Sequence, residues 1–192
     1  MAKHSDDEWR SKAALILLLL MLLLLLEKCS KSMSKSRSNS VYGTMANIGG
    51  INKAEIRTLI PHSGLMCLLD EVTQWDDRSI TCITNTHRDP ANPLRRDGRL
   101  SALHAFEYGA QAAAVHGGLR ARLVNALAPP GYLAALRDAR LHATQLDVIE
   151  SPLQVRALRL LGDGVNCVYE CHISAADTLL AEGRVTIIQR DR

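Results

Sequence analysis

A clear alternation of hydrophobic and polar residues lies at residues 79–87, and it predicts a β-strand. With a period of two, Ile80, Cys82 and Thr84 fall on one face of that strand. The hydrophobic residues within 67–77 predict another strand just before it. Because a turn built on two aspartates separates the segments, we expect the two strands to form a hairpin.

A helical segment follows the polar, proline-containing loop at residues 88–99. It begins at Ser101, a residue type that favours helix N-termini, and we expect it to end near Gly117 and Gly118. The segment is rich in alanine and glycine and contains a single acid, Glu107. We expect such a helix to be buried on nearly every side, because small side chains let a sheet approach closely.

The C-terminal part of the chain returns to strand-like sequence. Gly-Asp-Gly at 162–164 and Ala-Ala-Asp at 175–177 have the composition of turns, so we expect a hairpin at each. The four predicted strands are residues 132–144, 153–163, 165–174 and 178–189. The whole order predicts an α+β architecture, in which an antiparallel sheet wraps around one long central helix.

The beginning of the chain differs from the rest. Residues 13–26 are all apolar, a run shorter than the ~20 residues that span a membrane but within the ~7–15 of a signal-peptide core. Residues 28–40 are basic and rich in serine, which is typical of disorder. We therefore divide the chain into a leader, 1–44, and a folded domain, 45–192.

Two interpretations of the leader stay open. Residues 13–26 are a weak signal or single anchor, or the natural protein begins at Met45 or another internal methionine. We expect a cytoplasmic protein, attached to a membrane only if the apolar run is a genuine anchor.

The charge of the chain argues against nucleic-acid binding. Of the 23 Lys and Arg and the 20 Asp and Glu, seven and four respectively lie in residues 1–44, so residues 45–192 carry 16 of each. A domain with balanced charge has no electrostatic footprint for nucleic acid, and we expect no such partner.

The cysteines do not form a recognisable metal or disulfide motif. The five are scattered and lack a CxxC pair: Cys29, Cys67, Cys82, Cys167 and Cys171. This pattern favours buried thiols in a reducing compartment. A zinc site built from Cys167, Cys171 and His172 is a less favoured alternative. We expect no metal and no cofactor.

Three polar residues line up along the predicted helix. At 100° per residue, His104, Glu107 and Gln111 share one narrow stripe, whereas His116 points elsewhere. A carboxylate beside an imidazole is suited to general acid–base catalysis. The same three side chains would also serve as a hydrogen-bonded set that fixes the helix, and the pattern favours neither interpretation.

A further histidine lies in a loop. His62 follows Pro61 and precedes Ser63-Gly64, so it occupies a bend that is able to close over a pocket. A histidine in such a loop is either a local hydrogen-bonding residue or a catalyst. The remaining histidines, His87, His142 and His172, look like surface or strand positions, and we assign them no role.

Two segments resemble a known family. IPHSGLMCLLDEV at 60–72 resembles the opening motif of hotdog-fold 3-hydroxyacyl-ACP dehydratases, and FEYGAQAAAVHGGL at 106–119 resembles their central helix. The Glu-Tyr-x-Ala-Gln form is most similar to the predicted dehydratase branch of aryl-polyene-type gene clusters. With the matching strand layout, the resemblance covers nearly all of residues 54–189 and implies a hotdog fold.

The resemblance also implies a reaction and a set of site residues. Family members eliminate water from a 3-hydroxyacyl thioester with a histidine that removes a proton and an acid that helps the hydroxyl leave, while a helix N-terminus steadies the thioester oxygen. Glu107 matches the acid, and Gln111 and Tyr108 are expected to contact substrate. The family's Gly-His-Phe-Pro loop has no counterpart in this chain, which leaves His104 or His62 as the base.

The resemblance implies partners as well. Hotdog proteins pair, so we expect a homodimer or a heterodimer with another hotdog protein, and a substrate carried by phosphopantetheine on an acyl carrier protein. Arginines at 95–99 and 120–122 would then suit an acidic carrier. Two alternatives stay open: a non-catalytic hotdog subunit that pairs with an active dehydratase, and an acyl thioesterase.

Overall fold

The computed structural model describes residues 50–129, 131–162 and 166–189. The predicted leader, with its apolar run and serine-rich segment, lies outside these residues. In chain order the elements are β1 (Ile51–Asn52), α2 (Lys53–Ile56), the 3₁₀ turn η1 (Gly64–Met66), β2 (Glu71–Trp75), β3 (Ser79–Thr84), the 3₁₀ turns η2 (Thr86–Arg88) and η3 (Ala102–His104), α3 (Ala105–Leu123), β4 (Gly131–Leu141), β5 (Leu153–Gly162), β6 (Asn166–Ala175) and β7 (Thr178–Gln189).

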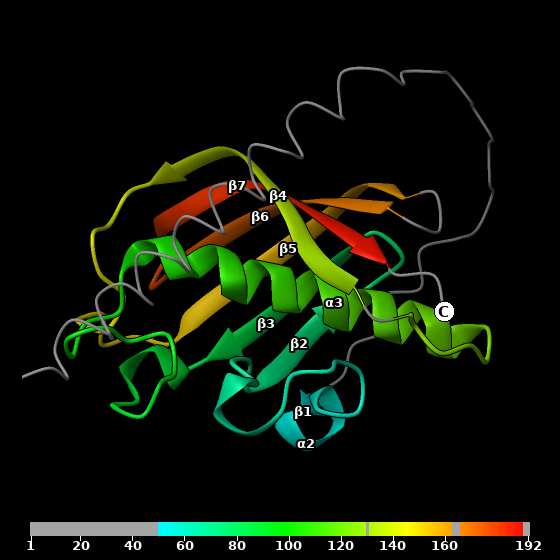
Figure 1. Cartoon of the computed structure of the whole chain (residues 1–192), viewed down its shortest axis with the longest axis horizontal. Coiled ribbons are helices and arrows are strands. Elements are labelled where there is room, and N and C mark those ends of the chain that lie inside the picture. The colour runs from blue at the N-terminus through cyan, green and yellow to red at the C-terminus, as the bar shows by residue number, and fades with distance from the viewer. Residues whose placement is uncertain (1–49, 130, 163–165, 190–192) are drawn as a thin grey trace, which may run out of the picture. The chain divides into compact units, whose positions relative to one another are not determined.

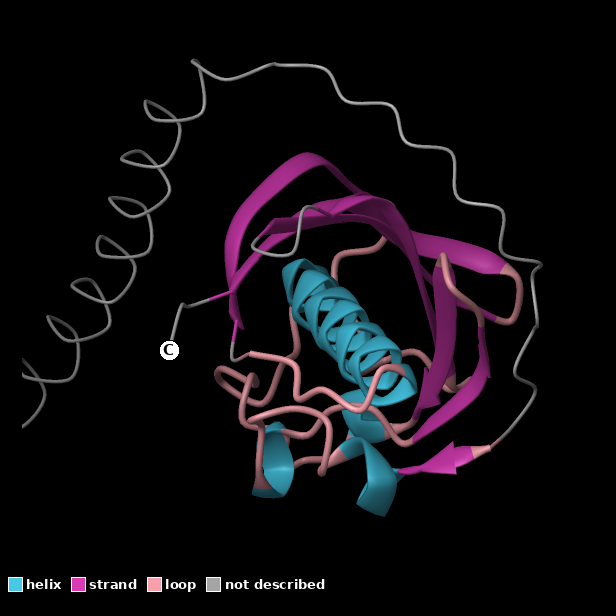
Figure 2. Cartoon of the chain, turned by 90° about the vertical axis from the view of Figure 1, so that its right-hand side faces the viewer, coloured by secondary structure: helices cyan, strands magenta, loops and turns pink. Residues whose placement is uncertain are grey.

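The strands form one antiparallel sheet that curves around α3. Their order across the sheet is β1-β2-β3-β5-β6-β7-β4, and every pairing is antiparallel. Figure 1 shows α3 crossing the inner face of the sheet, and Figure 2, turned by 90°, shows the sheet arching over the helix while loops and short helices lie on its other side. The predicted α+β hotdog fold is confirmed.

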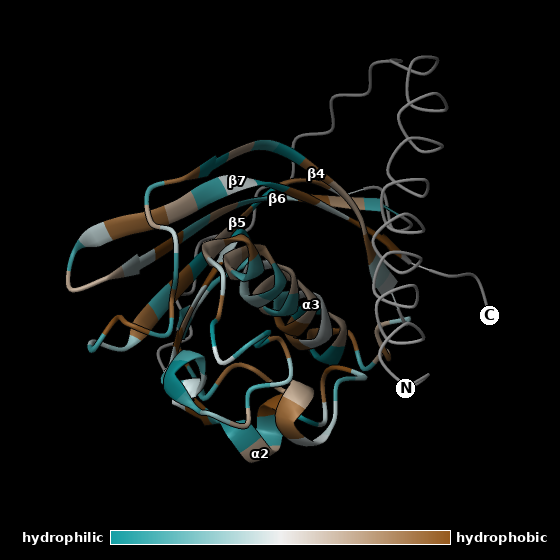
Figure 3. Cartoon of the chain, turned by 60° about the vertical axis from the view of Figure 1, so that its left-hand side comes forward, coloured by the Kyte–Doolittle hydropathy of each residue, from teal (hydrophilic) through white to brown (hydrophobic). Residues whose placement is uncertain are grey.

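The alternation that predicted β3 corresponds to its burial. Ile80, Cys82 and Thr84 are the buried residues of the strand, and the residues between them are half-buried. Figure 3 shows the same alternation of hydrophobic and hydrophilic residues along the strands around α3. The sheet therefore buries one face against α3, which explains why a period of two was readable in the sequence.

The strand predicted at 67–77 is shorter than expected. Only Glu71–Trp75 pairs as a strand, and the sequence also gave no sign of the two-residue β1. The Leu68 N–H donates to the Gln111 side chain, and the Leu68 carbonyl accepts from two threonine hydroxyls. Because side chains satisfy these backbone groups, the segment needs no partner strand there.

The central helix is longer than predicted. Ser101 does act as a cap, since its hydroxyl accepts from Leu103 N–H, but it caps the turn η3 and not α3 itself. At the other end α3 continues past Gly117 and Gly118 to Leu123. A Cβ on Gly118 would lie 3.1 Å from atoms of Leu59, so this glycine permits close packing and does not end the helix.

The four C-terminal strands lie where the sequence predicts them, with ends shifted by up to three residues. The β6–β7 turn has positive φ at Ala176 (44°) and Asp177 (64°), the backbone of a tight hairpin turn. Of the predicted Gly-Asp-Gly turn, residues 163–164 lie outside the described part, although β5 and β6 pair as expected.

The interior contains no cysteine pair among the described residues. Cys67, Cys82 and Cys171 are buried free thiols, and Cys167 is half-buried. Burial raises the pKa of Cys171 to about 12, so this thiol stays protonated. In the described ranges, no helix is both long and apolar enough to cross a membrane.

We expect Gly109→Val to lower the free energy of unfolding by about 1–3 kcal/mol, because the helix packs too closely on β6 to admit a side chain. A Cβ at Gly109 would lie 3.0 Å from the Cys171 sulfur. Gly117→Val is the matched control, since a Cβ there meets no atom of the described part of the chain within 4 Å. Urea denaturation of both variants checks this, and equal losses of stability would refute the packing explanation.

Candidate active site

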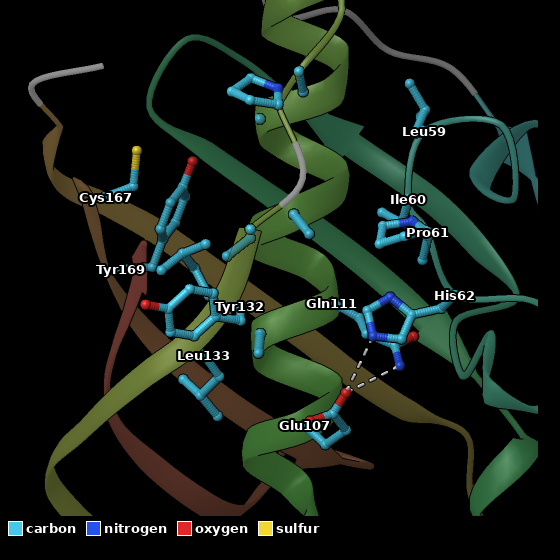
Figure 4. Close-up of a pocket in the computed structure, with 18 of the residues that line it drawn as sticks. Leu59, Ile60, Pro61, His62, Glu107, Gln111, Tyr132, Leu133, Cys167 and Tyr169 are labelled. Atoms are coloured by element: carbon cyan, nitrogen blue, oxygen red, sulfur yellow. Dashed lines mark hydrogen bonds and ion pairs between the residues drawn. The ribbon is translucent and has the colours of Figure 1, made fainter. Parts of the chain in front are cut away.

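A cavity of about 470 Å³ lies along α3 (Figure 4). One side is a row of mostly small residues of the helix: Glu107, Ala110, Gln111, Ala113, Ala114 and Gly117. The walls come from the segment before η1, from the loop before β4, and from the strands β4, β6 and β7. Their lining residues are Thr58, Leu59, Ile60, Pro61, His62, Ala128, Pro129, Gly131, Tyr132, Leu133, Cys167, Tyr169 and Ile187. Glu107 and His62 are the only Asp, Glu, His, Lys or Arg among these lining residues.

Glu107 lies in the first turn of α3, not in the middle of a helix as its place in the sequence suggested. Its side chain is 29% exposed and reaches into the cavity. The partial positive charge at a helix N-terminus favours a carboxylate at this position. The environment of this acid is therefore set by the helix dipole and by two neighbouring side chains, Gln111 and His62.

Gln111 is the first of these neighbours and is buried one turn further along α3. Its amide nitrogen donates to Met66 O (2.8 Å) and to Glu107 Oε1 (3.3 Å), and its oxygen accepts from Leu68 N–H (3.0 Å). This side chain thus ties the segment after His62 to the helix and orients the carboxylate. It lines the cavity, so its predicted substrate contact stays a prediction.

His62 is the second neighbour and comes from the loop that follows Pro61. Its Nε2 lies 3.6 Å from Glu107 Oε1. The loop is anchored on both sides of the histidine, by the Gln111–Met66 hydrogen bond and by a hydrogen bond from Arg122 to Thr58 Oγ1. The structure therefore brings together one of the two candidate bases and the candidate acid.

His104 lies outside the cavity. It is half-buried at the end of η3, and no hydrogen bond or ion pair joins it to Glu107 in the described part of the chain. Burial and the nearby charge of Arg96 lower the pKa of His104, while the charge of Glu107 opposes this. It is thus a neutral residue near the site at pH 7.

Tyr108 is also separated from the cavity. Its buried hydroxyl accepts hydrogen bonds from Thr86 Oγ1 (3.2 Å) and Asn92 Nδ2 (3.0 Å). Burial raises the pKa of Tyr108. These bonds fix the loop before α3 to the helix, and Tyr108 is not among the lining residues.

At the start of the helical segment, three backbone N–H groups already donate hydrogen bonds within the protein. Ala102 N–H donates to Thr144 O, and the N–H groups of Leu103 and His104 donate to Ser101. The oxyanion site that the family resemblance implies is therefore not available from these three groups.

The arginine clusters are partly used inside the protein. Arg95 is mostly buried, lies 3.8 Å from Asp147, and donates to the carbonyls of neighbouring loop residues. Arg120 pairs with Asp77 at 3.0 Å. Arg96, Arg99 and Arg122 are exposed, so the surface available to an acidic partner is smaller than the sequence suggested.

Two histidines are buried away from the Glu107–His62 pair. His87, which we expected on the surface or in a strand, is fully buried in η2 against Ile149 O. His116 Nε2 donates to Asp76 O (2.8 Å), and its Nδ1 accepts from the hydroxyl of Tyr169, which lines the cavity (2.9 Å). Burial lowers the pKa of both histidines below 6.5, so both are neutral in the folded protein.

We expect the protein to lose stability as the pH falls below 6.5. A histidine with a lowered pKa in the folded state contributes stability above its unfolded pKa, and this is lost as the pH falls towards the folded value. Thermal unfolding at pH 7.5, 6.5 and 5.5 measures the loss. His116→Gln should show a smaller decrease in Tm across this range; parallel decreases would show that His116 is not responsible.

Comparisons with known proteins identify the family of the chain. Residues 54–192 match the ApeP-like family model, described as ApeP dehydratase. The chain is similar to the dehydratase heterocomplex ApeI:P from Xenorhabdus doucetiae, with 27% identity, a TM-score of 0.65 and coverage of 71% of this chain and 91% of that chain. It shares its fold with Cj0977, a sigma28-regulated virulence protein from Campylobacter jejuni, at 12% identity, a TM-score of 0.51 and coverage of 72% and 90%.

No curated protein sequence matches the chain. The family model nevertheless spans most of the chain, including the His62 loop and all of α3. The chain therefore belongs to the ApeP-like dehydratase family.

Proposed function

We propose that the protein eliminates water from a 3-hydroxyacyl thioester carried by phosphopantetheine on an acyl carrier protein, in fatty-acid-like or polyene biosynthesis. The observation that carries the proposal is the Glu107–His62 pair, with 3.6 Å between Oε1 and Nε2, at one end of an apolar cavity. An acid and a base at this separation are able to act on adjacent carbons of one substrate.

The reaction needs two proton transfers. His62 Nε2 takes the proton from the carbon next to the thioester carbonyl, and the electron pair forms the new carbon–carbon double bond. The carbon–oxygen bond at the next carbon breaks, and Glu107 gives a proton to the departing hydroxyl, which leaves as water. This step requires the protonated form of Glu107, although the helix N-terminus favours the carboxylate in the resting protein. The two side chains then exchange the proton, which restores the starting state. The product is an enoyl thioester.

A hotdog partner fits the surface of the chain. β4 is the last strand of the sheet and pairs only with β7 among the described strands. Exposed apolar residues lie at the end of α3 and in the loop and strand after it: Leu123, Val124, Leu127, Tyr132 and Leu133. An edge strand beside exposed apolar side chains favours association. The similar protein from X. doucetiae is a heterocomplex, which supports a mixed dimer here.

The proposal is tested by incubating the full chain with a 3-hydroxyacyl carrier protein and following the acyl group by mass spectrometry. The chain is assayed alone and co-expressed with a second hotdog dehydratase from the same organism as a candidate partner. Loss of one water with the thioester intact is the expected result. Release of a free hydroxy acid would identify a thioesterase, and no reaction in either preparation would refute the proposal.

A non-catalytic role is the second candidate. The loop before α3 contains no histidine that matches the family's Gly-His-Phe-Pro motif, which favours a subunit that supports an active partner. In that case a mixed dimer would be active, and changes at Glu107 and His62 would leave its rate unchanged.

A further inference from the structure

Gly117 occupies a position in the helix that packing does not explain. A glycine inside a helix is less stable than an alanine, so it needs a compensating reason. Gly109 and Gly118 have one, because a Cβ at either would lie 3.0–3.1 Å from a packed neighbour. Among the described residues, a Cβ at Gly117 would meet nothing within 4 Å.

The space beside Gly117 belongs to the cavity. Along α3 the lining residues run from Glu107 to Gly117, a separation of ten positions, which corresponds to about 15 Å of helix. Figure 4 shows Glu107 at one end and Leu59 and Cys167 towards the other. Among the described lining residues, acidic and basic side chains lie only at the Glu107 end, so the remainder suits an apolar chain.

From these observations we infer that Gly117 sets the longest acyl chain that the site accepts. With the thioester end of the substrate at Glu107 and His62, the acyl tail extends along Ala110, Ala113 and Ala114 to the open space at Gly117. A larger side chain there would fill that space and leave the reacting end untouched. The inference rests on the proposed function, because it takes the substrate to be an acyl thioester.

The test compares short and long substrates. In Gly117→Leu we expect kcat/KM for a 3-hydroxytetradecanoyl thioester to fall at least about tenfold, since each methylene that loses its apolar site costs roughly fourfold. The tail of this substrate beyond the hydroxyl carbon is nearly as long as the roughly 15 Å of helix between Glu107 and Gly117. The value for a 3-hydroxybutanoyl thioester should stay close to that of the wild type. Equal losses at both lengths, or no loss at either, would overturn the inference.

The matched control is Ala121→Leu. Ala121 lies one turn beyond Gly117 on the same face of α3 but does not line the cavity, so this variant should keep the wild-type preference for chain length. A shift as large as that of Gly117→Leu would show that the effect is general to this end of the helix and would overturn the inference.

A binding measurement separates this inference from the proposed function. If the full chain and its mixed dimer do not dehydrate any substrate, the proposed function fails, and calorimetry with butanoyl- and tetradecanoyl-pantetheine tests Gly117 independently. The inference expects the wild type to bind the tetradecanoyl compound and Gly117→Leu to lose that binding. Failure of the wild type to bind it, or equal binding by both proteins, would refute the inference.

Discussion

Replacing Glu107 by Gln is expected to lower the dehydration rate by about 10²–10⁴-fold, the usual contribution of a positioned acid or base. The amide has almost the shape of the carboxylate and still occupies the position beside Gln111 and His62. It has no proton to give to a departing hydroxyl at neutral pH. The rate of enoyl thioester formation, measured with substrate in excess, checks this expectation.

The control for this variant is Glu150→Gln. Glu150 is exposed and lies outside the cavity, so the same chemical change should leave the rate near that of the wild type. Both variants should also unfold at nearly the wild-type temperature. A mixed dimer that keeps its full rate with Glu107→Gln would contradict the proposed role of this acid and would favour the non-catalytic subunit.

The sequence predicted the fold better than the ends of its elements. Alternation at Ile80 and Cys82 was readable because β3 buries a single face. The end of α3 could not be predicted from the sequence. A glycine is typical of a helix terminus, but Gly118 lies inside the helix and permits close packing against Leu59. The segment at Leu68 looked like a strand because it is apolar, although its backbone bonds to side chains distant in the sequence.

The site was predictable only where its residues are local in the sequence. Glu107 and Gln111 lie one turn apart on a helix, so their contact follows from helical spacing. The contact between His62 and Glu107 depends on how a loop lies against α3, which no periodicity reports. Tyr169 lines the cavity from β6. The sequence indicates this residue only through its inward position in the alternation of that strand.

Helical spacing placed His104 on the same stripe as Glu107. The local geometry shows why this prediction of a contact between them does not hold. The regular helix begins at Ala105, and His104 ends a 3₁₀ turn. A 3₁₀ turn has about 3.0 residues per turn, so a residue within it rotates away from the stripe that 3.6 residues per turn predicts. The role of His104 in catalysis stays a prediction that mutation decides.

Replacing His62 by Ala is expected to lower the dehydration rate by about 10²-fold or more, whereas His104→Ala should leave it near that of the wild type. Of these two histidines, His62 lines the cavity and has its Nε2 3.6 Å from Glu107 Oε1, whereas His104 does not line the cavity. Burial and the charge of Arg96 lower the pKa of His104, so it is mostly uncharged at pH 7, and its loss should change the field at Glu107 little.

The pair of variants decides between three arrangements of the base. A large loss in His62→Ala alone supports the Glu107–His62 pair. A large loss in His104→Ala alone would require the start of α3 to rearrange when substrate binds, because His104 does not line the cavity. If neither change slows a mixed dimer while Glu107→Gln does, the base must come from the partner subunit, with Glu107 as this chain's contribution to a shared site.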